Sequence, residues 1–407
     1  MHRRLVAAGL TIGCSFALAP SALAAAPHVK NQLIVKYADS ASSAERAAIA
    51  KRAGLRQRIG RVNANGADVV SVAGDAAAAA KRLNAEAGVL YAEIDYVMTA
   101  LELPNDPLFP QLYGMNQAND KDIDAPEGWD RAGTIAGTVG LKVGIVDTGI
   151  DRNHVDIGSA RVVNCAATTP GFLGIVGGNP NPSESRGCAD DHDHGTHVAG
   201  TIGAIANNNE GVAGVSPNAQ FGICKALHGA LGSGSTTGVA NCITYLAQRG
   251  NKIISMSLGG PASTTLQTAV TNATNAGSLL IAAAGNNGDA TLNYPAAYAQ
   301  VVSVAALDAN DNRASFSNAN ADVELAAAGV NVLSTKRGGG YIAFSGTSMA
   351  TPHVAGVASV VGGELGLTGT ALRNRLNLTA DDVTAYGAGR DTSTGFGRVN
   401  LNRALGG

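Results

Sequence analysis

The sequence predicts an α/β fold in which a mainly parallel sheet carries helices on both faces, with a small α+β unit ahead of it. Two observations predict this arrangement. After residue 104, short and continuously apolar segments alternate with helical stretches, which is typical of a parallel sheet that is buried on both faces. Before residue 103, a few strand and helix patterns occupy a much shorter stretch, and the run Leu-Pro-Asn-Asp-Pro at 103–107 breaks the periodicity between the two parts.

The first 24 residues are predicted to be a secretory signal peptide. A basic start is followed by an apolar run over 5–19 and by the small-residue pattern Ala-Leu-Ala, so cleavage is expected after Ala24. A transmembrane anchor is the alternative. The run is short and interrupted by polar residues, however, and no later segment reaches spanning length without charges or Gly and Pro breaks. Cys14 is expected to leave with this peptide.

The α+β unit is placed at 25–102. Runs of apolar and β-branched residues predict its strands, and Ala-rich runs predict its helices. We expect strands at 31–37, 68–72 and 89–97, and helices at 42–52 and 75–87.

The larger unit is placed at 103–407. Its expected strands lie at 142–146, 220–224, 253–257, 279–284 and 301–306, with helices that include 197–206 and 238–248. Functional groups collect at the carboxyl ends of such strands, so the chemistry of the protein is expected there. No further domain is expected after this one.

Composition and charge narrow the classes of function. The chain of 407 residues is 45% hydrophobic and 15% charged, which predicts a soluble globular protein. Its net charge of −2 provides no basic field, so no nucleic-acid partner is expected. No membrane association is expected once the signal peptide has been removed.

Four cysteines remain after the signal peptide. An even number in an exported protein favours two disulfides over a metal site. Three pairings are possible, and we favour Cys165 with Cys188 and Cys224 with Cys242 because each would close a short polar or Gly-rich loop. Four free buried thiols are the alternative.

Three segments carry residues suited to nucleophilic catalysis. Asp147 ends an apolar strand in Val-Gly-Ile-Val-Asp-Thr-Gly, His194 begins a helix in His-Gly-Thr-His, and Ser348 begins another in Gly-Thr-Ser-Met-Ala. A serine hydroxyl is a weak nucleophile at neutral pH, so it needs a hydrogen-bonded base, and that base needs an orienting group. A helix N-terminus also favours the negative charge that develops during such a reaction.

These three segments, in the order Asp, His, Ser, resemble the subtilisin family of serine peptidases (subtilases, peptidase family S8). The resemblance extends over nearly the whole chain after the signal peptide. Residues 28–102 resemble the inhibitory propeptide of the family, of the I9 type, and Thr394–Asn400 resembles its closing segment. The resemblance implies that Ser348 is the nucleophile, His194 the general base and then acid, and Asp147 the carboxylate that orients the imidazole.

The resemblance also implies an oxyanion hole and a substrate cleft. Asn286, in Ala-Ala-Ala-Gly-Asn-Asn-Gly, matches the residue whose amide pairs with the backbone N–H of Ser348. The segments Leu231–Ser235 and Ser257–Gly260 match the two strands of the family that hold an extended peptide through main-chain hydrogen bonds, which implies broad specificity. A phosphate-binding loop is the alternative for the first of them, but no Gly-Lys-Ser/Thr follows. The implied substrate-binding residues are Ser233, Gly234, Ser257, Leu258 and Gly259, with Asn293 near the base of the first specificity pocket.

A structural calcium ion is a further implication of the resemblance. The Asn-Asp-Pro run and the Asn-rich loop at 205–212 match the segments that hold it, and hard oxygen ligands suit calcium. The implied ligands are Asp106, Asp156, Ile205, Asn208, Glu210 and Val212. The continuation Asp156-Ile157-Gly158 departs from the usual family pattern. No organic cofactor is expected.

The sequence also suggests two alternative functions. A metallohydrolase is suggested by His192-Asp193-His194-Gly195-Thr196-His197, which has the His-x-His-x-x-His spacing of certain zinc sites. Such sites carry an Asp where Thr196 stands, and the Ser348 and Asn286 segments would have no role. An inactive subtilase that serves as a binding module is the second rival, but the triad residues and Asn286 are all present.

We therefore expect a secreted serine endopeptidase, found in the medium or in the periplasm. Its substrates are expected to be proteins and peptides, with apolar or uncharged residues before the cleaved bond. The precursor is expected to cut itself near 101–104, and the propeptide to stay docked as an inhibitor until it is degraded. We expect the protein to be a monomer.

Overall fold

The computed structural model describes residues 28–96, 103–171 and 178–407. It divides into two compact units, one on each side of the segment 97–102. The predicted signal peptide and its cleavage after Ala24 lie outside the described residues, as do positions 101 and 102 of the self-cleavage region predicted at 101–104.

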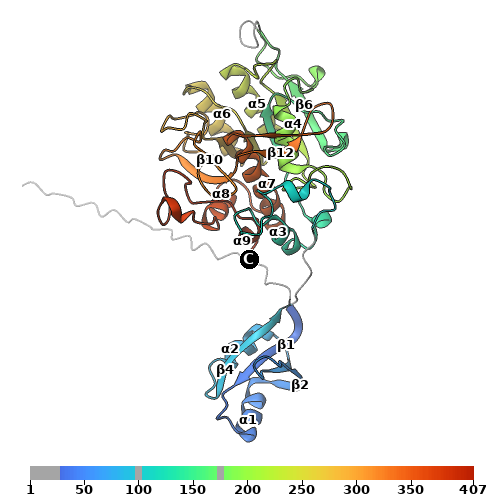
Figure 1. Cartoon of the computed structure of the whole chain (residues 1–407), viewed down its shortest axis with the longest axis vertical. Helices are drawn as coiled ribbons and strands as arrows, with labels where there is room; N and C mark the ends of the chain where they lie inside the picture. The colour runs from blue at the N-terminus through green and yellow to red at the C-terminus, as the bar shows by residue number, and fades with distance from the viewer. Residues whose placement is uncertain (1–27, 97–102, 172–177) are drawn as a thin grey trace, which may run out of the picture. The chain divides into compact units, whose positions relative to one another are not determined.

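The first unit is a four-stranded antiparallel sheet with two helices (Figure 1). The strands run in the order β2-β3-β1-β4. Buried residues of β1, β3 and β4 pack against α1 and α2, with Leu33, Val35 and Leu83 at the centre. The elements are β1 His28–Tyr37, α1 Ser43–Ala53, β2 Leu55–Arg61, β3 Asp68–Val72, α2 Ala76–Leu83 and β4 Val89–Tyr96.

The expected elements of this unit are present, with ends shifted by a few residues. Ser42 starts α1 through a capping box with Glu45, in which each side chain accepts a hydrogen bond from the other residue's backbone N–H. Strand β2 is absent from the sequence prediction. It is an edge strand that exposes Arg56, Gln57 and Arg58, so it has no buried face to produce an apolar pattern.

The second unit is built on a seven-stranded parallel sheet in the order β11-β10-β9-β8-β5-β7-β6. A separate antiparallel hairpin, β12–β13, packs beside α4. The strands are β5 Val143–Asp147, β6 Val162–Ala167, β7 Phe221–Lys225, β8 Ile253–Met256, β9 Leu279–Ala283, β10 Val301–Leu307, β11 Val323–Ala328, β12 Val332–Thr335 and β13 Tyr341–Phe344.

Helices cover both faces of this sheet, which confirms the predicted fold class. Alternate residues of β8 show the two faces: Ile253 packs in the cluster of α4 and α7, and Ile254 in that of α5 and α6. The helices are α3 Ala125–Arg131, α4 His194–Gly203, α5 Thr236–Gln248, α6 Thr264–Asn275, α7 Thr347–Leu365, α8 Gly369–Leu378 and α9 Leu401–Ala404.

Hydropathy singles out one pair of helices. Within the described ranges, no helix is by itself long and apolar enough to cross a membrane; the pair α7 and α8, bent by 111°, could do so by length and composition only.

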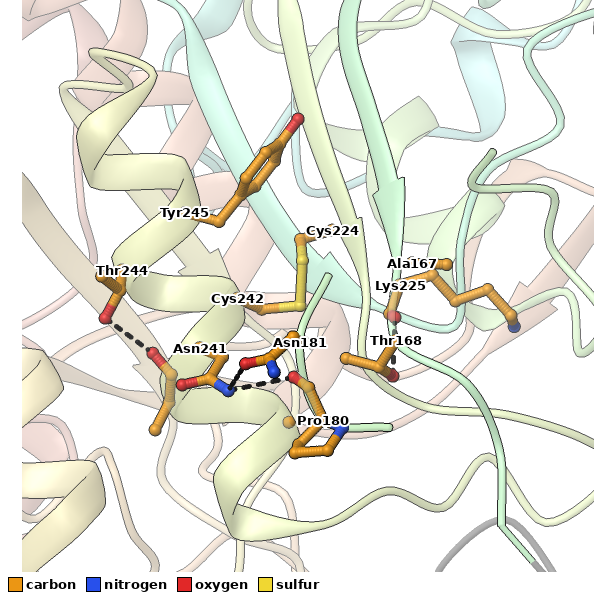
Figure 2. Close-up of a disulfide and its surroundings, with 12 residues drawn as sticks. Ala167, Thr168, Pro180, Asn181, Cys224, Lys225, Asn241, Cys242, Thr244 and Tyr245 are labelled. Carbon is orange, nitrogen blue, oxygen red and sulfur yellow. Dashed lines mark hydrogen bonds between the residues drawn. A yellow bond between two sulfur atoms is a disulfide. The ribbon is translucent and has the colours of Figure 1, made fainter. Parts of the chain in front are cut away.

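Two disulfides tie the sheet to its surroundings. Cys165 on β6 is bonded to Cys188, and Cys224 on β7 is bonded to Cys242 on α5, which are the two sequence-local pairings favoured above. Figure 2 shows the second bridge, beside which Asn241 donates hydrogen bonds to Pro180 O and Asn181 Oδ1. The bridges close loops of 23 and 18 residues, and each stabilises the fold by about 3 kcal/mol in the chain-entropy account.

Candidate active site

The site lies at the carboxyl edge of the parallel sheet, where β5 ends. All five residues of β5 are buried, and its last residue, Asp147, is fully buried. The Nδ1–H of His194 donates to Asp147 Oδ1 at 2.7 Å, and the backbone N–H of Thr148 donates to the same oxygen at 2.6 Å. The His194 side chain is 19% exposed, so it is largely buried but still accessible from outside.

The local sequence explains how α4 comes so close to β5. His194 is the first residue of α4, and Gly195 follows it. A Cβ atom at Gly195 would lie 2.1 Å from the carbonyl oxygen of Gly149, so only glycine permits this approach. Gly149 itself has a φ of +113° in the turn after β5.

The electrostatic environment of His194 combines two opposing effects. Burial disfavours the charged imidazolium, but the carboxylates of Asp147 and Asp190 stabilise it, and their effect prevails. The net result raises the pKa of His194 above its ordinary value. His194 is therefore a stronger base than a free imidazole.

Two other buried histidines have the opposite character. Burial lowers the pKa of His197 to about 3 and that of His353 to about 4, so both are neutral at neutral pH. His197 Nε2 bonds the carbonyl of Val332 at 2.9 Å, and its ring stacks on Phe344. In the part of the chain that the structure describes, no three His, Cys, Asp or Glu side chains form a group able to hold a metal ion. The three histidines of His-x-His-x-x-His thus do not converge as the metallohydrolase alternative requires.

Ser348 lies in the first turn of α7 and faces β8. Its hydroxyl donates to Ser257 O at 3.2 Å, and the Ser257 hydroxyl donates in return to Ser348 O at 2.7 Å. This reciprocal pair fixes the start of α7 against the segment after β8. Within the described ranges, Ser348 Oγ makes no hydrogen bond to His194; catalytic hydrogen bonds are often long or poorly aligned before substrate binds.

Asn286 follows β9 and is held by a residue that the sequence reading did not single out. Both the backbone N–H and the hydroxyl of Thr347 donate to Asn286 Oδ1, each at 2.9 Å. The carbonyl oxygen of the amide is thus occupied, and its Nδ2 is left as a donor beside the start of α7. The position of Thr347 next to Ser348 was the available signal, but a threonine at a helix start is also an ordinary capping residue.

A groove of about 470 Å³ runs past His194. One wall is the segment 231–235 and the other is the segment 257–261, so Ser233, Gly234, Ser257, Leu258 and Gly259 all line the same space.

Asn293 is not among the residues that line this groove. Its Nδ2 donates to Ala283 O at 2.8 Å, and a Cβ atom at Gly259 would come within 2.0 Å of its amide. Asn293 therefore lies against Gly259, one of the residues of the groove wall.

The residues implied for calcium also come together. Asp106 Oδ2 accepts from Asn207 N at 2.8 Å, and Asp156 accepts from Asn208 Nδ2 at 2.8 Å and from Val212 N at 3.0 Å. Asp106 Oδ1 is buried and has no hydrogen-bond partner. Burial raises the pKa of Asp106, and the nearby negative charge of Asp156 adds to this effect. Two buried carboxylates, one of which has an oxygen without a hydrogen-bond partner, would be stabilised by a cation.

The family comparisons agree with the motifs. Residues 138–397 match the subtilase family, and residues 18–95 match the fervidolysin N-terminal prodomain. Thermitase of Thermoactinomyces vulgaris is 41% identical over 303 residues, which is 74% of this chain and 99% of thermitase. A thermophilic serine proteinase of Bacillus sp. (strain AK1) is 34% identical over 379 residues, which is 93% of this chain and 88% of that protein.

A solved structure shares the fold. A protease of Pseudoalteromonas arctica PAMC 21717 superimposes with a TM-score of 0.62 at 29% identity, covering 75% of this chain and 99% of its own.

Proposed function

Because the chain belongs to the subtilase family of serine endopeptidases, we propose that it is secreted, has broad specificity, and works through an acyl-enzyme on Ser348. The observation that carries the proposal is the 2.7 Å bond between the buried carboxylate of Asp147 and His194. His194 lines a groove whose wall includes Ser257, the hydrogen-bond partner of Ser348.

In the proposed reaction, Ser348 Oγ attacks the carbonyl carbon of the scissile bond and gives its proton to His194 Nε2. Asp147 holds the proton on Nδ1, which leaves Nε2 free to act as the base, and it stabilises the imidazolium. His194 then donates the proton to the leaving amine. A water molecule, activated by the same imidazole, hydrolyses the ester on Ser348 and restores the hydroxyl.

The negative charge on the tetrahedral intermediate needs donors in place before the reaction. Asn286 Nδ2 and the backbone N–H of Ser348 supply them in the proposal. Thr347 has already oriented the Asn286 amide, so little reorganisation is required when the charge appears.

Substrate recognition is proposed to rely on the two segments that form the groove walls. Extended peptides would pair with their main-chain groups, which carry no sequence information. Among the residues that the structure describes, no Asp, Glu, Lys or Arg lines the groove, so no such charge is in place to select a charged substrate. We expect apolar or uncharged residues before the cleaved bond.

The chain carries an N-terminal prodomain, and we propose that the precursor cuts itself near 101–104. The released prodomain would then remain bound as an inhibitor until it is degraded. Secretion is supported by the two disulfides, which persist in oxidising compartments. The mature enzyme is proposed to be a monomer.

A serine-directed organophosphorus reagent tests this mechanism. We expect it to form one covalent adduct, on the peptide that contains Ser348, and to abolish hydrolysis of casein in proportion to labelling. Casein hydrolysis that survives complete labelling, or an adduct elsewhere, would contradict the proposal and reopen the metallohydrolase alternative.

We also propose that a calcium ion stabilises the second unit. The free Asp106 Oδ1 is the observation that fits it, because a hard oxygen donor without a hydrogen-bond partner suits calcium. The ligands would be side-chain oxygens of Asp106, Asp156 and Asn208 together with backbone carbonyl oxygens in the loop, at Ile205, Glu210 and Val212. A bound calcium would supply positive charge between the two carboxylates.

Calcium should therefore raise the unfolding temperature. We expect a rise of about 5–10 °C when free calcium is about 100 times its dissociation constant, relative to excess chelator. Calorimetry on Ser348→Ala, which avoids self-digestion, measures it. Asp106→Ala should lose most of the calcium-dependent shift. Equal unfolding temperatures with calcium and with chelator would refute the site.

A further inference from the structure

Asp190 lies in the loop that leads into α4, and its buried carboxylate accepts five hydrogen bonds. Oδ1 accepts from Thr148 Oγ1 at 2.8 Å, His192 N at 2.9 Å and Asp193 N at 3.3 Å. Oδ2 accepts from Thr196 N at 3.0 Å and Thr196 Oγ1 at 2.6 Å. Asp190 is 8% exposed. One buried side chain thus determines the path of the backbone on both sides of His194.

The same carboxylate reaches the strand that carries Asp147. Thr148, which donates to Asp190, directly follows Asp147, and its hydroxyl also accepts from Gly195 N at 2.9 Å. Asp190, Thr148 and Gly195 therefore form a continuous chain of hydrogen bonds from the end of β5 to the start of α4. The Asp147–His194 bond spans the same gap.

The charge of Asp190 is not neutralised by an ion pair. The neighbouring Asp191 pairs with Lys225 Nζ at 2.6 Å, and that ammonium also donates to Thr148 O and Leu227 O. Across the described ranges, no lysine or arginine forms an ion pair with Asp190. Burial disfavours its ionised form, but the hydrogen bonds from Thr196, His192 and Thr148 outweigh burial and lower the pKa of Asp190.

We propose that Asp190 is a positioning residue for catalysis. Its hydrogen bonds keep Asp147 and His194 at hydrogen-bonding distance, and its negative charge stabilises the imidazolium that forms during the reaction. This inference rests on the proposed function, since it assumes that His194 is the base. The raised pKa of His194, to which Asp190 contributes after Asp147, agrees with it.

Other groups near His194 must be held constant in any test of pH dependence. Asp147 on β5, His192 in the loop and His197 on α4 interact with it directly. The same loop carries Asp191, which pairs with Lys225 at the end of β7, and Asp193, which pairs with Arg337. Asp190→Asn leaves all of them unchanged.

The direct test measures the pKa of His194 by NMR in the full-length Ser348→Ala protein, with and without Asp190→Asn. We expect the pKa of His194 to fall by about one unit when the charge of Asp190 is removed. In the enzymatically active chain, the acidic limb of the kcat/KM profile should move to lower pH, and kcat should fall about ten-fold or more with KM little changed.

A second pair of variants separates positioning from a loss of folding. Thr148→Val removes the hydroxyl that links Asp190 to Gly195 and should lower kcat, whereas Thr148→Ser keeps the hydroxyl and should restore it. Glu324→Gln is the matched control, because Glu324 is also a buried carboxylate but lies on β11, at the far edge of the sheet. It should lower the unfolding temperature without moving the pH profile.

The outcomes distinguish the two proposals. If Asp190→Asn leaves the pKa of His194 and kcat unchanged, or if it only lowers the unfolding temperature as Glu324→Gln does, Asp190 is not a positioning residue and the triad mechanism stands. If Ser348→Ala still cuts its own prodomain or casein, the proposed mechanism itself fails.

Discussion

Ser348→Ala is expected to leave the chain as an intact precursor that does not digest casein. The variant keeps the Asp147–His194 pair and the groove but has no nucleophile to form the acyl-enzyme. Loss of this serine costs about 10⁶-fold in kcat in a subtilisin, the system from which the magnitude is known. Intact mass and casein hydrolysis measure the two effects together. Unaltered chains should lose residues up to about 101–104, whereas the variant should not.

Ser345→Ala is the matched control for this substitution. Ser345 is an exposed serine in the same segment, and its hydroxyl accepts from Asn331 N at 2.8 Å, away from the groove. It should mature and cut casein within about two-fold of the unaltered chain. A Ser348→Ala variant that matures on its own would show that another group performs the cleavage.

Asn286→Ala is expected to lower kcat by about 10² to 10³-fold, the loss known for the equivalent donor in a subtilisin, with little change in KM. The physical reason lies in when the hydrogen bond forms. Asn286 Nδ2 meets a full negative charge only in the transition state, so its removal raises the barrier more than it weakens binding. Steady-state kinetics on a chromogenic peptide separate kcat from KM.

Asn287→Ala is the matched control for Asn286→Ala. Asn287 is exposed and its backbone N–H donates to Asn318 Oδ1 at 2.8 Å, so Asn287→Ala keeps that hydrogen bond. It should retain kcat within about two-fold. Equal losses in the two variants would mean that the loop after β9, and not the Asn286 amide, accounts for the effect.

The buried strands that could be predicted from the sequence are those made mostly of apolar residues. Strands β7 and β8 are buried along their whole length and consist mostly of apolar residues, so they could be located from the sequence. Strand β11 is equally buried but was not predicted, because it contains Glu324. That buried charge is compensated from α8, where Arg373 pairs with it and Asn377 donates a hydrogen bond to it. A partner from a distant helix cannot be read from a local pattern.

The residues of the site could likewise be predicted only where a local sequence pattern marked them. Asp147, His194 and Ser348 could be named because each lies in a distinctive motif, and the structure gives the Asp147–His194 bond. Asp190 and Lys225 could not be singled out. Asp190 stands in an ordinary run of acidic and histidine residues, and only the folded chain shows that its carboxylate accepts hydrogen bonds from both sides of the catalytic pair.

The position of the site at the strand ends determines when during folding the site can form. Asp147 and His194 are 47 residues apart in sequence, and Ser257 and Ser348 are 91 apart. Loops of this length close late in folding and at an entropic cost. A chain with only part of its sheet therefore lacks the assembled site. We expect casein hydrolysis to appear only after these distant segments have come together.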